Sequence, residues 1–234
     1  MKQSPGDHVR AVLFDLDGTL FDHAGAAIEA LRVWLPAVGV EPSDDALSRW
    51  FASEELHVAE WRAGRASWAE QRRRRLRDVL PDGSALSSSE LDDRFEGYLT
   101  HYEAAWRAFS DVGETLAILD ARDVRVGILT NGAREQQGAK LVAIGLAGRF
   151  EFVLTTEDLG VAKPHPVAYL AACQRFALDP AEVMHVGDLP DLDVAAPREV
   201  GLRALLIDRD DVHGQADALR SLLELPARLD LTSR

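Results

Sequence analysis

The chain has 234 residues, 47% of them hydrophobic, and its 26 basic and 39 acidic side chains give a net charge of −13. A chain of this length and apolarity can bury a sizeable core, as one domain with an insertion or as two small domains. The acidic balance argues against nucleic acid and anionic membranes as partners, because both repel a negatively charged surface. The single cysteine, Cys173, excludes an internal disulfide and fits a reducing compartment.

No segment has the features of a targeting signal or a membrane span. The first ten residues lack the apolar stretch of a secretion signal, and no apolar run approaches the ~18 residues that span a bilayer. We therefore predict a cytoplasmic protein that has no membrane partner.

The pattern of apolar residues changes twice along the chain. A short apolar run, Val9–Phe14, predicts a buried strand that ends at Asp15. Residues 24–109 show only helical spacing and contain all five tryptophans, which we expect to form a core. Strands then alternate with helices, with strands predicted at residues 124–130, 152–154, 183–186 and 203–207. This order predicts an α/β fold, a parallel sheet covered by helices on both faces with a helical insertion after the first strand.

Four segments place polar groups where a predicted strand ends or where a helix begins beside the sheet. They are Asp15 with Asp17, Thr130-Asn131-Gly132, Lys163 before Pro164, and Gly187-Asp188 with Asp193. Taken singly, each is typical of an ordinary turn, helix cap or solvated side chain. In open parallel sheets, however, ligands bind at the carboxyl ends of the strands. We therefore interpret the four segments as parts of one site.

The residue types in these segments suit phosphoryl chemistry. Acidic groups that share a small volume need a cation, and hard oxygen ligands select Mg²⁺. Magnesium and a lysine together neutralise a phosphoryl group, while a threonine hydroxyl and helix-start amides bind it. Asp15 would attack phosphorus to give an aspartyl-phosphate that water then hydrolyses. Asp17 would protonate the leaving oxygen and later activate that water.

The ordered motifs FDLDGTL, ILTNG, VAKP and HVGDLPDLD resemble those of the haloacid dehalogenase-like (HAD) hydrolase superfamily. More narrowly, the chain resembles the phosphatase branch that carries a helical, C1-type cap after the first strand. The resemblance covers nearly the whole chain, and its first motif is the most specific. It implies a Rossmann-like catalytic core at residues 1–22 and 110–234 and a helical cap at residues 23–109.

The resemblance also implies roles for the catalytic groups. Asp15 would be the nucleophile and a metal ligand. Asp17 would be the general acid and base, and would bind the metal through its backbone carbonyl. Thr130 would bind the phosphoryl group, together with Asn131 and Gly132, and Lys163 would stabilise its charge. Because the dehalogenases that name the family lack an acid at the position of Asp17, the resemblance favours phosphate ester hydrolysis.

The fourth motif implies the rest of the metal site, with two departures from the family pattern, one of which is Leu189 where many members carry a small polar residue. Asp188 would be a metal ligand, and Asp193 would join the site and orient Lys163 or a metal-bound water. The family often has Gly-Ala shortly after the last aspartate, where this chain has Ala196-Pro197. Because proline disrupts a helix beyond its first turn, we expect a short or kinked helix there. We also expect Asp193 to be less firmly placed than Asp188.

The sequence therefore predicts a Mg²⁺-dependent phosphatase of a small phosphorylated metabolite, acting as a monomer or homodimer. Two alternatives stay open: a phosphosugar mutase with the same site, and a relative that binds phosphate without catalysis. Haloacid dehalogenation is a more distant alternative.

Four further features have predicted places. The arginines at 72–75 and 77 cannot form one patch, because consecutive helical residues point to different sides. We expect them to be solvated and to pair with nearby acids, as charge runs usually are. Gly64-Arg65 is a candidate specificity loop. We expect His185 to pack beside the sheet, and residues 226–234 to form a loose tail.

Overall fold

The computed structural model describes residues 8–230 and divides into two compact units. The first, here called the sheet unit, comprises the chain up to Asp22 and from Arg107 onward. The second, the helical unit, is His23–Trp106. Contacts thus divide the chain at the end of the first strand segment and again before residue 110. The assignment of these parts as catalytic core and cap stays a prediction.

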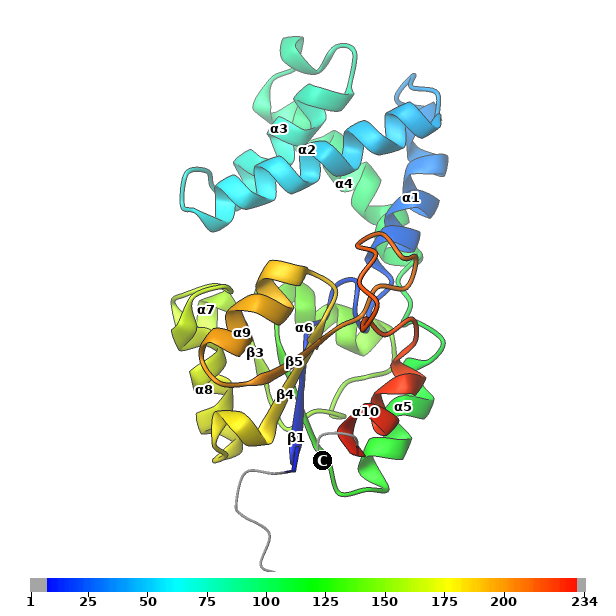
Figure 1. The fold of residues 1–234 in the computed structure, drawn as a ribbon. Helices are drawn as coiled ribbons and strands as arrows, with labels where there is room; N and C mark the ends of the chain where they lie inside the picture. The colour runs from blue at the N-terminus through cyan, green and yellow to red at the C-terminus, as the bar shows by residue number, and fades with distance from the viewer. Residues whose placement is uncertain (1–7, 231–234) are drawn as a thin grey trace, which may run out of the picture. The chain divides into compact units, whose positions relative to one another are not determined.

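A five-stranded parallel sheet forms the centre of the sheet unit, as the alternating pattern predicts (Figure 1). Its order is β3-β2-β1-β4-β5. The bounds are β1 (Ala11–Phe14), β2 (Arg125–Leu129), β3 (Val153–Leu154), β4 (Val183–Gly187) and β5 (Arg203–Leu206). Phe14 of β1 pairs in register with Ile128 of β2 and Val186 of β4. The residues that follow these three strands therefore emerge together at one edge of the sheet.

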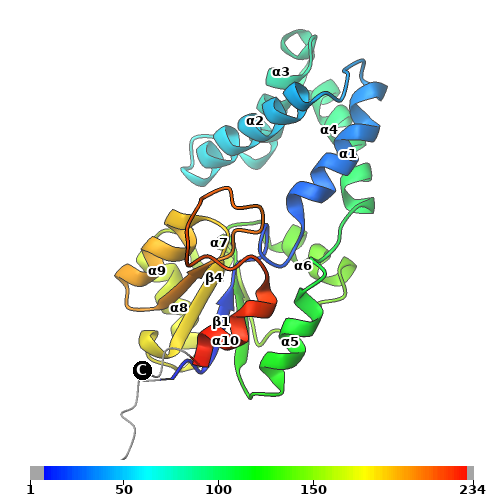
Figure 2. The ribbon, with the colours of Figure 1, turned by 45° about the vertical axis from the view of Figure 1, so that its right-hand side comes forward.

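Helices cover both faces of this sheet, which confirms the predicted α/β, Rossmann-like fold (Figure 2). On one face lie α5 (Val112–Asp120), α6 (Arg134–Ala143) and α10 (Leu225–Asp230). On the other lie α8 (Pro166–Phe176) and α9 (Ala196–Glu199), while the short α7 (Thr156–Leu159) follows β3. Tyr169 and Phe176 of α8 are fully buried in one core cluster with Leu13 of β1. All four residues of β1 are buried, as a strand covered on both faces requires.

The predicted loose tail is wrong for the part of it that the structure describes. Residues 225–230 form α10, which follows the 3₁₀ turn η4 (Leu222–Glu224). Leu225 and Leu229 are buried, four residues apart on one side of this helix. Their apolar contact fixes the segment against the sheet unit. Residues 231–234 lie outside the described part of the chain.

The helical unit consists of α1 (His23–Ala37), α2 (Asp44–Arg62), α3 (Trp68–Val79) and α4 (Ser88–Ala104), with the 3₁₀ turn η1 (Gly83–Ala85) between the last two. Aromatic side chains fill its interior. Trp50 is fully buried, and its ring centroid lies 4.4 Å from that of Tyr98 and 5.8 Å from that of Trp34. The tryptophans at 34 and 50 are thus core residues, as predicted, whereas Trp61 and Trp68 are half-buried and pack on each other.

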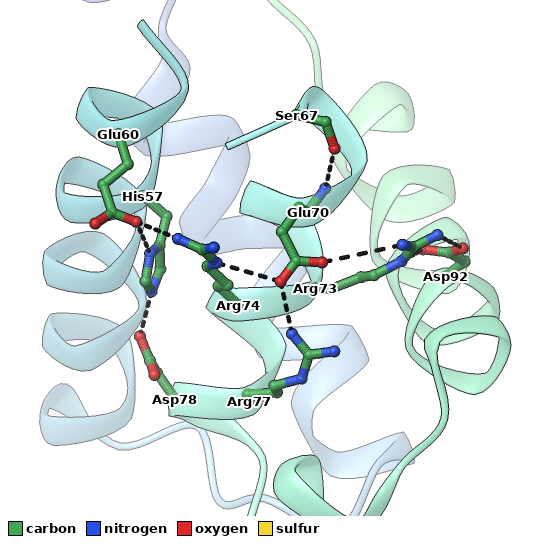
Figure 3. A network of polar contacts seen from close by, with 9 residues as sticks. All are labelled: His57, Glu60, Ser67, Glu70, Arg73, Arg74, Arg77, Asp78 and Asp92. Atoms are coloured by element: carbon green, nitrogen blue, oxygen red, sulfur yellow. Dashed lines mark hydrogen bonds and ion pairs between the residues drawn. The ribbon is translucent and has the colours of Figure 1, made fainter. Parts of the chain in front are cut away.

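The arginine run on α3 pairs with acids of the same unit, as the sequence predicts. Arg73 binds Asp92, Arg74 binds Glu60 and Glu70, and Arg77 binds Glu70 (Figure 3). Arg75 differs, because it is buried, lies over the ring of Trp50 and pairs with Glu54 at 2.9 Å. Gly64 and Arg65 form the exposed turn between α2 and α3, and the specificity role of that turn stays a prediction. Across residues 8–230, no helix is both long enough and apolar enough to cross a membrane.

Candidate active site

Three carboxylates converge at the edge where the strands end. Asp15 follows β1, Asp188 follows β4, and Asp193 lies in the π-helical turn η3 (Pro190–Ala195). One oxygen from each lies within 4.8 Å of the others. The prediction required the carboxyls of Asp15 and Asp188 to lie closer than ~10 Å, since metal–oxygen bonds span only about 2 Å. The structure meets that condition.

Lys163 supplies a cation to this cluster. Its side chain is buried, and Nζ donates to Asp15 Oδ1 at 2.6 Å and to Asp193 Oδ1 at 2.7 Å. The distant VAKP segment is thus joined to the first and fourth motifs by one ammonium group. Three ionised carboxylates and one ammonium would leave two negative charges uncompensated within the group. Such an excess at a buried site favours protonation or the binding of a cation.

The pKa values in the cluster follow from burial and charge. Burial raises the pKa of Asp15 well above its usual value, the charges of Asp193 and Asp188 add to this, and Lys163 opposes it. Burial and the charge of Asp193 raise the pKa of Asp188 to about 7. Burial alone would raise the pKa of Asp193, but Lys163 and His185 together lower it below its usual value. Asp193 is therefore the ionised partner of Lys163, while Asp15 and Asp188 are the carboxyls that a metal ion would relieve.

The residues present fit a hard divalent cation such as Mg²⁺. Asp188 Oδ1 is buried and has no hydrogen-bond partner among residues 8–230. A buried acceptor that is left unpaired costs free energy, and a metal ion held by oxygen ligands would satisfy it. The donor set consists of carboxylate oxygens, which are the ligands that Mg²⁺ prefers.

Glycines make room for two of these carboxylates. Gly18 has a positive φ of +84°, and a Cβ added there would lie 2.2 Å from Asp188 Oδ2. A Cβ added at Gly187 would lie 2.2 Å from Asp193 Cγ. Both acids therefore need a residue without a side chain beside them.

The expected weak placement of Asp193 is wrong. Pro197 does limit the helix, because α9 spans only Ala196–Glu199 with the proline in its first turn. However, η3 precedes α9 and buries Asp193 completely. Its carboxylate also contacts His185 Nε2 at 2.9 Å and accepts from the amide of Leu189 at 3.0 Å. Asp193 is therefore held more firmly than Asp188, whose Oδ1 has no partner.

The side chain of Asp17 contacts a second polar group, on α6. Asp17 Oδ2 accepts from Gln137 Nε2 at 2.7 Å, and Asp17 Oδ1 pairs with the ammonium of Lys140. The same amide of Gln137 donates to Thr130 Oγ1 at 2.7 Å. Asp17 and Thr130, which the sequence assigns to one site, are thus linked through Gln137. That Asp17 binds metal through its backbone carbonyl stays a prediction.

The side chain of Asn131 binds the backbone of Lys163. Its amide donates to the carbonyl of Lys163 at 2.9 Å, and its carbonyl oxygen accepts from the amide of Lys163 at 2.8 Å. Gly132 donates its amide to Thr130 Oγ1 at 3.2 Å. Asn131 therefore positions the lysine segment, while the predicted substrate contacts of Asn131 and Gly132 stay predictions.

Sequence reasoning missed the parts of Gln137 and Lys140 and only partly described His185. His185 is buried beside the sheet as predicted, but it also supports Asp193. Gln137 and Lys140 lie on α6 outside any motif that we recognised. Their signal in the sequence is weak. Two polar residues lie three positions apart, the second of them directly before Leu141, and this is the side of α6 that the structure buries.

Known proteins resemble this chain in sequence and in fold. The sequence model described as haloacid dehalogenase-like hydrolase matches residues 9–201. The chain is 37% identical over 132 residues to the haloacid dehalogenase-like hydrolase domain-containing protein 3 of Danio rerio, a match that covers 53% of each chain. It is 29% identical to the glyceraldehyde 3-phosphate phosphatase of Methanopyrus kandleri, over 86% of this chain and 84% of that protein. The match thus spans about half the length of the first relative and most of the second.

Two solved structures share the fold over 95% of this chain. The HAD-hydrolase YfnB from Bacillus subtilis, described as bound to magnesium, matches with a TM-score of 0.79 at 20% identity over 99% of its own chain. The 2-haloacid dehalogenase of Pseudomonas syringae matches with a TM-score of 0.64 at 32% identity, also over 99% of its chain. The relatives include a protein named as a phosphatase and one named as a dehalogenase, so fold alone does not choose between phosphate ester hydrolysis and carbon–halogen cleavage. The side chains of the site must distinguish the two reactions.

Proposed function

The chain belongs to the haloacid dehalogenase-like hydrolase family, and we propose that it is a phosphatase that hydrolyses a small phosphorylated metabolite with Mg²⁺ as cofactor. The observation that carries this proposal is the grouping of Asp15, Asp188 and Asp193 around Lys163, with a buried unpartnered oxygen on Asp188. Such a site suits a metal ion and a phosphoryl group together, because each compensates the charge of the other.

Asp15 and Asp188 would hold the metal ion, and Asp193 would hold Lys163 beside it. When bound, Mg²⁺ would neutralise negative charge on the phosphoryl oxygens and on the two carboxylates. Lys163 would neutralise a further part of that charge from within the protein, since its ammonium already contacts Asp15. Thr130 would donate its hydroxyl to the phosphoryl group.

The reaction has two balanced steps. A carboxylate oxygen of Asp15 attacks phosphorus, the bond from phosphorus to the leaving oxygen breaks, and Asp17 gives its proton to that oxygen. The product is an aspartyl-phosphate on Asp15 and a free alcohol. Asp17 then takes a proton from water, which attacks phosphorus and releases inorganic phosphate, so that Asp15 is restored.

The side chains favour phosphate ester hydrolysis over carbon–halogen cleavage. A halide leaves without a proton and needs no general acid, whereas an alkoxide leaving group needs one. Asp17 offers such an acid next to Thr130. A buried carboxylate cluster whose excess charge favours a cation likewise serves a phosphoryl dianion and has no task in displacing halide from carbon.

Phosphate release from an aryl phosphate in the presence of Mg²⁺ tests the proposal. Asp15→Asn should abolish turnover while the protein stays folded, because an amide oxygen is a poor nucleophile. Asp191→Asn is the matched control, since Asp191 is an exposed acid in η3, two residues from Asp193. Turnover that persists in Asp15→Asn removes Asp15 as the nucleophile. Chloride release from 2-chloropropionate, with no phosphate release, would point instead to a dehalogenase.

The two alternatives have separate outcomes. A phosphosugar mutase would move the phosphoryl group between sugar hydroxyls and release no free phosphate. A non-catalytic relative would bind inorganic phosphate but turn over nothing in a panel of sugar, nucleotide and amino-alcohol phosphates.

In the proposed phosphatase, the helical unit acts as a cap that selects the leaving group. We further propose that the protein is cytoplasmic and acts as a monomer or homodimer.

A further inference from the structure

Two polar residues of α6 are buried where a helix facing a sheet would carry apolar side chains. Gln137 is 0% exposed and Lys140 is 3% exposed. They lie three residues apart and therefore on the same side of the helix. The ammonium of Lys140 also lies 4.7 Å from the ring centroid of Phe21. A buried ammonium is costly unless a charged partner compensates it. The partner of Lys140 therefore indicates which group in the site this residue serves.

Both residues act on the carboxylate of Asp17. Lys140 pairs with Oδ1 and Gln137 donates to Oδ2 at 2.7 Å, so each oxygen of Asp17 has its own donor from α6. Gln137 also donates to the hydroxyl of Thr130. These contacts fix the carboxylate of Asp17 at a set place relative to Thr130, the residue assigned to the phosphoryl group.

We propose that Lys140 and Gln137 are positioning residues, which hold the carboxyl of Asp17 beside Thr130 for proton transfer to the leaving oxygen. The inference rests on the proposed function, because it concerns the proton-transfer residue of that reaction. It divides the two buried lysines of the sheet unit between two tasks. Lys163 serves the nucleophile Asp15, and Lys140 serves Asp17.

The charge balance of the first step gives Lys140 a specific part. As the bond from phosphorus to the leaving oxygen breaks, Asp17 loses its proton to that oxygen and becomes a carboxylate. The new negative charge forms beside the side chain of Lys140, which pairs with Asp17 Oδ1. In the second step Asp17 regains a proton from the attacking water.

The dependence of the rate on the leaving group tests this role. A p-nitrophenolate ion leaves without a proton, whereas an alkoxide needs one, so only an alkyl phosphate requires Asp17 in the first step. We compare p-nitrophenyl phosphate with the alkyl phosphate of the screening panel that has the highest wild-type kcat/KM. The constant kcat/KM is the readout, because it reports steps up to the first irreversible one and excludes hydrolysis of the aspartyl-phosphate.

Lys140→Met should lower kcat/KM for the alkyl phosphate by about 10²-fold and for p-nitrophenyl phosphate by less than about tenfold. Gln137→Met should act in the same direction. Lys140→Arg keeps the charge, so it should recover part of the kcat/KM that Lys140→Met loses on the alkyl phosphate. Glu135→Ala is the matched control, because Glu135 is exposed on the same helix and should leave both constants unchanged. A crystal structure of Lys140→Met should show the carboxyl of Asp17 displaced from Thr130.

The outcomes separate this inference from the proposed function. Equal losses on both substrates in Lys140→Met, or an unmoved Asp17 in its crystal structure, overturn the positioning role and leave the phosphatase assignment standing. A wild-type protein that hydrolyses neither phosphate ester overturns the proposed function, and the inference with it. If Lys140→Met does not fold, equal losses in Lys140→Arg and Gln137→Met overturn the inference in the same way.

Discussion

The affinity of the carboxylate cluster for Mg²⁺ should depend on pH, because protons and the metal ion compete for the same oxygens. Both proposed ligands, Asp15 and Asp188, take part in this competition, because burial raises the pKa of each. The pKa of Asp188 is raised to about 7 by burial and by the charge of Asp193. Metal ligands must lose their protons before they bind, so Mg²⁺ should bind more tightly at pH 8 than at pH 6.

The size of the effect follows from that pKa. For one competing proton with a pKa of about 7, the apparent dissociation constant rises about elevenfold at pH 6 and hardly at all at pH 8. The two pH values should therefore differ about tenfold in affinity, or about 1.4 kcal/mol. At a fixed, saturating Mg²⁺ concentration, the rise in the midpoint of thermal unfolding that Mg²⁺ produces should therefore be about 3–6 °C larger at pH 8 than at pH 6 for a chain of this size.

The sign for the metal-free protein is the reverse. A carboxyl whose pKa is raised by folding holds more protons in the folded than in the unfolded state between the two pKa values. Stability without metal should therefore fall as the pH rises from about 4 through about 7. Saturating Mg²⁺ should cancel this fall between pH 6 and pH 8, since the bound ion takes the place of the lost proton at Asp188.

Isothermal titration calorimetry at pH 6 and pH 8 measures the affinities, and thermal unfolding with and without Mg²⁺ measures the stabilities. Asp188→Asn should weaken Mg²⁺ binding and flatten its dependence on pH, whereas the control Asp191→Asn should change neither. The reasoning is refuted if the affinity of the wild type is the same at both pH values. It is refuted equally if Asp188→Asn keeps both the wild-type affinity and its pH dependence.

Two further predictions concern a glycine beside the site and an ion pair of the sheet unit. Gly18→Ala would place a Cβ 2.2 Å from Asp188 Oδ2, so it should abolish the stabilisation by Mg²⁺. Gly64→Ala is the control, because Gly64 has a similar φ of +70° and open space around it. That variant should lose only about 1–2 kcal/mol of unfolding free energy and keep the stabilisation by Mg²⁺. Normal Mg²⁺ stabilisation in Gly18→Ala would contradict the close approach. The guanidinium of Arg209 forms a bidentate ion pair with the buried carboxylate of Asp111, with nitrogen–oxygen distances of 2.7 and 3.1 Å. Arg209→Met should therefore lower the free energy of unfolding by about 3 kcal/mol. A double-mutant cycle with Asp111→Asn measures their coupling by chemical denaturation, and a coupling near zero would show that the pair does not stabilise the fold.

The sequence by itself determined the fold class and the order of the polar segments. Apolar runs that stop at Asp15, Thr130 and Asp188 marked the ends of three strands, and alternation with helices made those strands parallel. Parallel strands end at one edge, so the convergence of these residues followed from local pattern and sheet geometry alone. The point at which a strand ends is a local property of the chain, so the sequence could express it directly.

The pairing of individual side chains was decided only by the tertiary structure. Pro197 suggested a loosely held Asp193, yet the π-helical turn before it buries that acid and gives it three partners. The predicted loose tail forms a helix over residues 225–230, because two leucines find an apolar surface. In both cases a contact made far away in the chain outweighed a local preference.

The polar groups around Asp17 show the same limit most clearly. Gln137 and Lys140 are 120 and 123 residues away from Asp17 along the chain, and they belong to no motif. Which oxygen of an aspartate meets which donor depends on how α6 packs against the sheet and on the directions of long side chains. Those directions are set by packing in three dimensions, so they become visible only once the chain is folded.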